Sequence, residues 1–168
     1  MSVTVFDLIS PAAFSSLWYW VVVALVWTRV AQAPMGLPVD AYDQARRIGG
    51  DDDAFALLRT GVARHLGQGL RVQQLGVALW AFLLSSLAGL AVLGLELAQA
   101  LLFLAAPLGL AHLLVRATAQ RMAGMEPALD PLLAELARLR LRLQIIAVLA
   151  IFVTAVYGML HTLGARAF

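Results

Sequence analysis

The chain has no cysteine and little charge. Of its 168 residues, 13% are charged and 62% are hydrophobic. The absence of cysteine excludes disulfides, thiolate nucleophiles and thiolate-ligated zinc or iron–sulfur clusters. A soluble domain carries about 25% charged residues, so we expect the apolar surface of this chain to face lipid or other membrane helices.

Lysine is absent as well, because all twelve basic residues are arginines. The formal net charge is +2, and no basic run could follow a phosphate backbone. We therefore exclude nucleic acid as a partner. No nucleophile–base pair, phosphate-binding loop or metal-ligand spacing is visible in the sequence. We expect no enzymatic activity and no bound cofactor.

Long uncharged stretches are the main feature that is present. Four of them reach the length that crosses a bilayer, about 20 apolar residues. They cover residues 8–28, 72–95, 97–115 and 143–165. We predict an all-α polytopic membrane protein, a single domain of four transmembrane helices in an antiparallel bundle. The predicted spans are about 11–30, 73–94, 96–116 and 142–164, with cytoplasmic segments at 34–71 and 117–141.

The distribution of arginine predicts the orientation of the bundle. Six of the twelve arginines lie between the first and second uncharged stretches, and five lie between the third and fourth. Cytoplasmic loops are enriched in Arg and Lys, so we place both segments in the cytoplasm and both termini outside. Ala31-Gln32-Ala33 is similar to a signal-peptide cleavage site. No positive charge precedes the apolar run, however, and Pro34 would follow the cut, so we expect the first span to be retained.

The first cytoplasmic segment contains two predicted helices. Residues 40–47 form a short one, and Gly49-Gly50 breaks it. Three aspartates then start a longer helix, because carboxylates stabilise a helix N-terminus. Its apolar residues recur every three or four positions and form one face. They are Phe55, Leu58, Val62, Leu66 and Leu70. This face predicts an amphipathic helix that lies on the membrane surface or packs on a partner protein.

The fourth span extends beyond the membrane on its cytoplasmic side. Nothing breaks the helical pattern from Pro131 to Leu163, which corresponds to roughly 50 Å at 1.5 Å per residue. An apolar stripe follows the projecting part, at Leu132, Leu136, Leu139 and Leu143. We expect the other cytoplasmic helix or a partner to cover this stripe.

Polar residues within or between the spans are the candidate site residues. Glu96 lies in the turn between the second and third spans, and Gln99 follows one helical turn later. Glu96 is predicted to cap the third helix, with a proton or cation site as the alternative. His112 and His161 would lie near opposite membrane edges, roughly 20 Å apart, so they could not ligate one haem iron within the chain.

Two ridges of small residues predict close helix packing. One lies on the second span, at Ala81, Ser85 and Gly89. The other lies on the fourth span, at Ala150, Thr154, Gly158 and Thr162. Such ridges let helix backbones approach each other, either within one chain or between copies. A homo-oligomer is therefore one of the expected arrangements.

Several segments resemble a family of small bacterial inner-membrane proteins labelled "component of SufBCD complex". They are FSSLWYWVVVALVW (14–27), GLPVDAYDQARRIGG (36–50), ELAQALLFLAAPLGL (96–110) and FVTAVYGML (152–160). The resemblance implies a bacterial inner-membrane location, with both termini periplasmic in our orientation. It also implies association with an iron–sulfur assembly machine, the Suf complex, as a membrane anchor or adaptor.

Three functional hypotheses follow. The first is a non-enzymatic accessory protein whose cytoplasmic face contacts a partner complex. The second is a small transport or channel component that uses Glu96, Gln99 and a kink at Pro107. The third is a haem or quinone subunit of a membrane electron-transfer complex.

Overall fold

The computed structural model describes residues 13–32, 35, 39–67, 70–125 and 128–164. The regular secondary structure in these ranges is entirely helical, which confirms the all-α part of the predicted fold class. It consists of one short 3-10 helix and five α-helices. They are η1 (Ala13–Ser15), α2 (Leu17–Gln32), α3 (Val39–Leu66), α4 (Leu70–Val92), α5 (Glu96–Ala123) and α6 (Leu129–Gly164).

Three of these helices are long and apolar enough to cross a membrane. They are Arg71–Val92 of α4, Glu96–Ala123 of α5 and Leu129–His161 of α6. The first predicted span, about 11–30, differs. There α2 has only 16 residues, about 24 Å at 1.5 Å per residue, whereas the bilayer core is about 30 Å thick. It follows η1, and residues 11–12 lie outside the described residues. The structure therefore shows three helices of spanning length and one shorter apolar helix.

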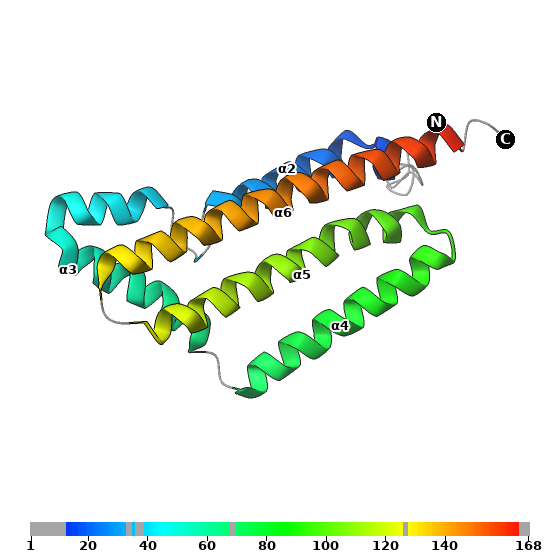
Figure 1. Cartoon of the computed structure of the whole chain (residues 1–168). Helices are drawn as coiled ribbons and strands as arrows, with labels where there is room; N and C mark the ends of the chain where they lie inside the picture. Colours follow the sequence, from blue (N-terminus) through cyan, green and yellow to red (C-terminus); the bar gives the residue numbers. More distant parts are fainter. Residues whose placement is uncertain (1–12, 33–34, 36–38, 68–69, 126–127, 165–168) are drawn as a thin grey trace, which may run out of the picture.

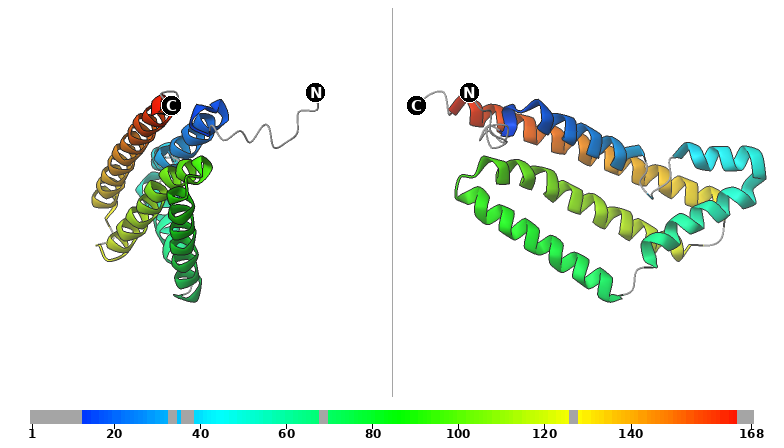
Figure 2. Two further views of the ribbon diagram at one scale, coloured as in Figure 1. Left: turned by 90° about the vertical axis from the view of Figure 1, so that its right-hand side faces the viewer. Right: turned by 180° about the vertical axis from the view of Figure 1, so that it is seen from behind.

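The helices form an elongated antiparallel arrangement. In Figure 1, α5 and α6 lie side by side at its centre. Figure 2 shows that α2 lies along α6, whereas α4 packs on the other side of α5. The helix α3 closes one end by packing on α5 and α6. At the opposite end lie η1, the turn between α4 and α5, and the last turn of α6 (Figure 1).

A glycine makes the tight turn between α4 and α5. Gly94 has a φ of +87°, a left-handed conformation that side chains disfavour. Its N–H donates to the carbonyl of Ala91 at 3.1 Å, and the N–H of Leu95 donates to the carbonyl of Leu90 at 3.2 Å. These are the two hydrogen bonds of a Schellman motif. The predicted turn between the second and third spans is confirmed.

A second glycine divides α3 into two halves. Gly50 has φ 80° and ψ −169°, which interrupts the helical backbone. The predicted break at Gly49-Gly50 is confirmed, and the second half begins with the three aspartates, as expected. The two halves fold back toward each other, so that the first half reaches the start of α6 (Figure 1).

The apolar face of the second half of α3 is covered by the chain itself. Leu58 and Val62 are buried, and Phe55 and Leu66 pack around the same cluster. The side chain of Leu70 lies outside the described part. The predicted alternatives, a membrane surface or a partner protein, are therefore wrong for the centre of this face. The reason is that α5 and α6 continue beyond their uncharged stretches, and the continued parts pack on this face of α3.

The same cluster buries the apolar stripe of α6. Leu132, Leu136, Leu139 and Leu143 are between 0% and 4% exposed, and they share their cluster with Met122 of α5 and the residues of α3. Of the two expected covers, the helix α3 is confirmed, together with the end of α5. We call this unit the cap: α3, residues 116–123 of α5 and residues 129–142 of α6.

The arginines gather at the cap end of the molecule. Arg29 lies in the last turn of α2, and Arg71 lies at the start of α4. Arg116 and Arg142 mark the points where α5 and α6 enter the cap. The other seven arginines of the described residues are Arg46, Arg47, Arg59, Arg64, Arg121, Arg138 and Arg140, and Arg166 lies outside the described residues. The two arginine-rich segments therefore lie at the same end of the bundle (Figure 1), as predicted.

Candidate functional sites at the two ends of the bundle

At the end away from the cap, Glu96 accepts a hydrogen bond from η1. Its Oε1 accepts a hydrogen bond from the backbone N–H of Phe14 at 3.0 Å. The N-cap of α5 is Leu95, which makes no side-chain capping bond. The prediction that Glu96 caps its own helix is therefore wrong. The carboxylate instead satisfies a backbone donor 82 residues away in the sequence.

Phe14 is the centre of an aromatic cluster at this end. The residue is 4% exposed, and its ring lies 5.4 Å from that of Tyr157 and 6.4 Å from that of Phe103, between centroids. Its backbone carbonyl accepts a hydrogen bond from Nε1 of Trp20 at 2.9 Å. Both backbone polar groups of Phe14 are thus satisfied by side chains. The aromatic cluster thereby ties η1 and α2 to α5 and α6.

Gln99 connects three helices at the same end. Its Nε2 donates to the carbonyl of Ala91 on α4 at 3.1 Å, and its Oε1 accepts from the hydroxyl of Tyr157 on α6 at 3.0 Å. Tyr19 of α2 adds a bond from its hydroxyl to the carbonyl of Ala100, at 3.1 Å. The polar groups near the predicted site residues therefore serve helix–helix contacts.

The structure separates the two histidines. The ring of His161 lies 6.1 Å from Phe14 and 6.2 Å from Tyr157, between centroids, so it belongs to the aromatic cluster. His112 is exposed on α5, sixteen residues from Glu96, which places it about 24 Å along the helix. No group of three His, Asp or Glu that could hold a metal occurs among the described residues.

The small-residue ridge of α6 packs within the chain. Thr154 is 3% exposed and bonds to the carbonyl of Ala150 at 2.7 Å. A Cβ added to Gly158 would come within 3.1 Å of the Phe14 side chain, so this glycine makes room for the ring. The side chain of Thr162 lies outside the described part. Close packing of the fourth predicted span is confirmed for this ridge.

The ridge on α4 differs. Ala81, Ser85 and Gly89 are exposed, and nothing lies within 4 Å of a Cβ added to Gly89. The prediction that this ridge packs within the chain is therefore wrong. The alternative, packing between copies, stays a prediction. The helix instead contacts α5 through Trp80, whose indole lies against Gly109. Sequence reasoning missed this pair, although Gly109 is the kind of small residue that admits a large neighbour.

Phe14 and Tyr157 were also missed. Their positions in the sequence carry no periodic pattern that would distinguish them from lipid-facing aromatics. Only the close approach of η1 to Gly158 brings them together. One feature of the sequence could have indicated this cluster. Gly158 lies between Tyr157 and His161 on one helix, and a glycine near two aromatic rings leaves space for a third ring.

Substitution of Glu96 tests the contact with Phe14. Glu96→Ala leaves the N–H of Phe14 without its acceptor, and a part-buried unsatisfied donor costs about 1–3 kcal/mol. We expect that loss in the free energy of unfolding, measured by helical circular dichroism in mixed micelles. Glu96→Gln keeps a carbonyl oxygen as acceptor and should lose less than half as much. Equal stability of the Ala variant and the parent would show that the hydrogen bond contributes nothing.

The cap presents an apolar groove to solvent. It lies between the second half of α3 and the junction of α5 with α6, and its volume is about 200 Å³. We call it the cap groove. Its apolar lining includes Phe55, Val62, Leu66, Met122, Met125 and Leu132. The one charged lining residue is Arg59, whose guanidinium lies 5.5 Å from the centroid of the Phe55 ring.

A second hollow adjoins the cap groove and shares Phe55 with it. Its volume is about 350 Å³. We call it the acidic hollow, because its charged lining residues are Asp51, Asp52 and Asp130. Sequence reasoning did not predict either concavity, since both depend on how α3 folds back beside α6.

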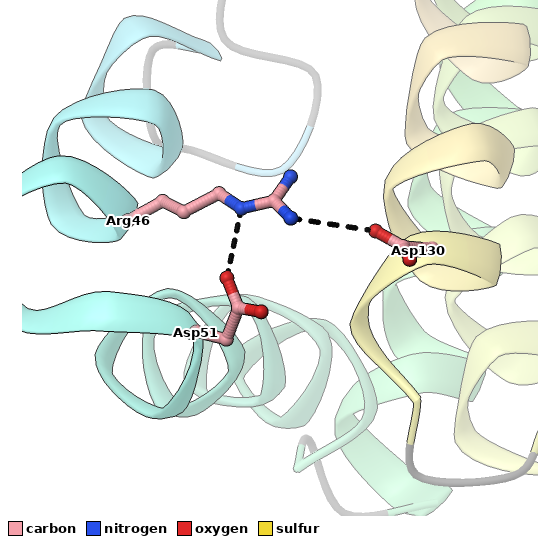
Figure 3. Close-up of polar contacts among 3 residues, drawn as sticks. All are labelled: Arg46, Asp51 and Asp130. Carbon is pink, nitrogen blue, oxygen red and sulfur yellow. Dashed lines mark hydrogen bonds and ion pairs between the residues drawn. The ribbon is translucent and has the colours of Figure 1, made fainter.

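Arg46 joins the two halves of α3 to α6 beside the acidic hollow. Its Nε lies 2.8 Å from Asp51 and its guanidinium 3.7 Å from Asp130. Figure 3 shows the arginine extended between the two carboxylates. All three side chains are at least 46% exposed, and such pairs contribute only about 0–1 kcal/mol. The bridge therefore positions the first half of α3 more than it stabilises the cap.

A more buried ion pair lies inside the cap. The side chain of Glu135 is 10% exposed and contacts Arg138 at 3.0 Å and Arg142 at 3.9 Å. Both arginines follow Glu135 on the same helix, and together they balance the negative charge of a carboxylate next to the apolar stripe of α6. These ion pairs therefore stabilise the helix.

Comparison of the chain with family models, with curated proteins and with solved structures finds no match.

Proposed function

We propose that this chain is a non-enzymatic accessory protein of the bacterial inner membrane. It spans the membrane four times with both termini in the periplasm. Its cap lies in the cytoplasm and binds a protein partner. The observation that carries the proposal is the cap itself. Its buried side chains belong to a core that continues into the apolar parts of α2, α5 and α6, and it keeps an open apolar groove.

The contacts of η1 support a fourth span. Together η1 and α2 cover residues 13–32, a length of about 30 Å if helical throughout. In lipid, unsatisfied backbone groups cost several kcal/mol. Glu96 and Trp20 satisfy the N–H and the carbonyl of Phe14, where the short 3-10 turn would otherwise leave them unpaired. The shorter helix can therefore reach the level of the α4–α5 turn.

The charge distribution supports the orientation. Eleven arginines lie at the cap end, whereas the turn at Gly94 carries none. Arginine resists export across the inner membrane, so the cap stays in the cytoplasm. Four arginines lie at the boundary, each at the cap-side end of the apolar part of a different helix. They are Arg29, Arg71, Arg116 and Arg142. Uncharged helical stretches that end in arginines on one side are typical of a transmembrane bundle.

The resemblance to the "component of SufBCD complex" family makes the Suf machine the first candidate partner. A role as anchor or adaptor requires no cluster on this chain, which has no cysteine to hold one. The transport and electron-transfer hypotheses stay predictions. The hydrogen bonds of Glu96 and Gln99 serve packing here, so neither residue favours ion movement over a structural role.

Photo-crosslinking in cells tests the proposed function. A photoreactive amino acid replaces Ile48, which is 79% exposed on the cap, or Leu79, which is 66% exposed on α4. We expect a discrete protein adduct from position 48, identified by mass spectrometry, and only lipid adducts from position 79. The two positions share a large exposed aliphatic side chain, so Leu79 is a matched control. Lipid adducts alone from both positions would contradict a cytoplasmic protein partner.

A further inference from the structure

The cap groove is the most distinctive concavity that the packing of the described residues leaves open. Its volume of about 200 Å³ is below the roughly 300–1,000 Å³ of small-molecule sites. It can therefore hold one or two large apolar side chains. Two of its lining residues, Met122 and Met125, are methionines, and this flexible thioether side chain is favoured at adaptable binding surfaces.

The acidic hollow continues the groove along α3. Phe55 lines both, so an occupant of the groove also faces the carboxylates. Arg46 pairs with Asp51 and Asp130, while Asp52 has no ion pair within the described residues. The cap is otherwise rich in arginine. An acidic patch beside an apolar groove in this setting is complementary to an occupant that is apolar and basic.

The position of the hollow argues against lipid as the occupant. Asp130 lies twelve residues before Arg142, where the apolar part of α6 begins, about 18 Å along the helix. The headgroup layer on one side of a bilayer is only about 5–8 Å thick. Anionic headgroups would also be repelled by the three carboxylates. The acidic hollow therefore faces the cytoplasm beyond the reach of the membrane surface.

We propose that the cap groove and the acidic hollow together bind an amphipathic helical segment of a protein partner. The segment places a large apolar side chain in the groove and Lys or Arg residues over the hollow. This is the helix-in-groove mode of recognition, in which anchors one turn apart on one helix face meet an apolar trough. The proposal rests on the proposed function, because it names the chemistry of the partner that the cap binds.

The test uses the full chain in nanodiscs and a display library of random peptides about 16 residues long, roughly four helical turns. We expect the selected peptides to share a large apolar residue within two turns of a Lys or Arg. Met125→Asp, which puts a charge into the groove, should weaken their binding at least about tenfold, or 1.4 kcal/mol. Asp52→Lys should weaken it about fivefold, and Asp40→Lys, the same change outside the hollow, should not. Circular dichroism checks that each variant is folded, and Met125→Ala gives a milder second variant.

Four outcomes would overturn the inference. The first is selection of acidic peptides, and the second is equal binding of the selected peptides to the parent and to Met125→Asp. The third is a retained lipid that native mass spectrometry detects in the parent but not in Met125→Asp. The fourth is a dimer of the parent that Met125→Asp dissociates. The crosslink from position 48 distinguishes the two proposals, because Ile48 lines neither concavity. A protein adduct there that persists in Met125→Asp would leave the proposed function intact while the docking inference fails.

Discussion

Replacing Gly158 with leucine is expected to lower the free energy of unfolding by about 3 kcal/mol, the upper range for overpacking. A Cβ at this position already meets three side-chain atoms of Phe14 at 3.1–3.2 Å. Phe14 cannot move aside cheaply, because Glu96 and Trp20 hold its backbone. The larger side chain should therefore displace η1 and loosen α2. Unfolding in mixed micelles, followed by helical circular dichroism, measures the loss.

Gly89→Leu is the matched control. The same substitution is made in a helix that is also long and apolar enough to cross a membrane, but nothing lies within 4 Å of the new Cβ. It should change stability by less than about 1 kcal/mol, since leucine favours a helix over glycine by about that amount. Gly158→Ala should fall between the two, because its gain in helix propensity offsets a contact that must yield by a few tenths of an ångström. Equal effects of the two leucine variants would show that Phe14 does not occupy the space at Gly158.

Features set by neighbouring residues could be predicted from the sequence. The break in α3 follows from two glycines before three aspartates, and the turn at Gly94 follows from a glycine between two apolar runs. The gathering of arginines at one end follows from the cost of moving charge through lipid. The break and the turn depend on interactions within a few residues, and the position of the arginines depends on the difference between water and hydrocarbon. Both effects can be predicted from the sequence without knowledge of the fold.

Features set by distant contacts could not be predicted. Glu96 lies at a helix start, so a capping role was the reasonable expectation, yet its acceptor oxygen faces Phe14 across 82 positions. The two small-residue ridges looked alike, but only the one containing Gly158 has a neighbour in the chain. A small residue permits close approach without specifying what approaches. The partner depends on which helices become adjacent.

The candidate site on the cap shows the same division. The amphipathic pattern of α3 and the stripe on α6 were each visible in the sequence, and each required a cover. Their mutual burial, with Leu58 and Leu139 both at 0% exposure, follows from the fold-back of α3. Because the two faces do not match completely, they leave the cap groove open. An imperfect fit between two helices has no signature in the sequence of either.

Single cysteines should be labelled from opposite sides of the membrane according to the end of the bundle on which they lie. The parent chain has no cysteine, so each introduced thiol is the only reactive one. We expect Leu17→Cys and Leu93→Cys to react with a membrane-impermeant maleimide in cells whose outer membrane is permeabilised. Ile48→Cys should react only after lysis, because the cap carries the arginines that hold it inside. All three positions are at least 75% exposed, so accessibility within the fold does not limit the reaction.

Gln32→Cys decides whether α2 crosses the bilayer. Leu17 and Gln32 are the first and last residues of this helix, so opposite labelling of the two requires a fourth span. Labelling of both from one side would leave α2 as a helix that does not cross and would place three spans in the membrane. An even number of spans returns the chain to its starting side, whereas three spans put the described ends on opposite sides. Because η1 and the last turn of α6 meet in the aromatic cluster, we expect the ends of α2 to be labelled from opposite sides.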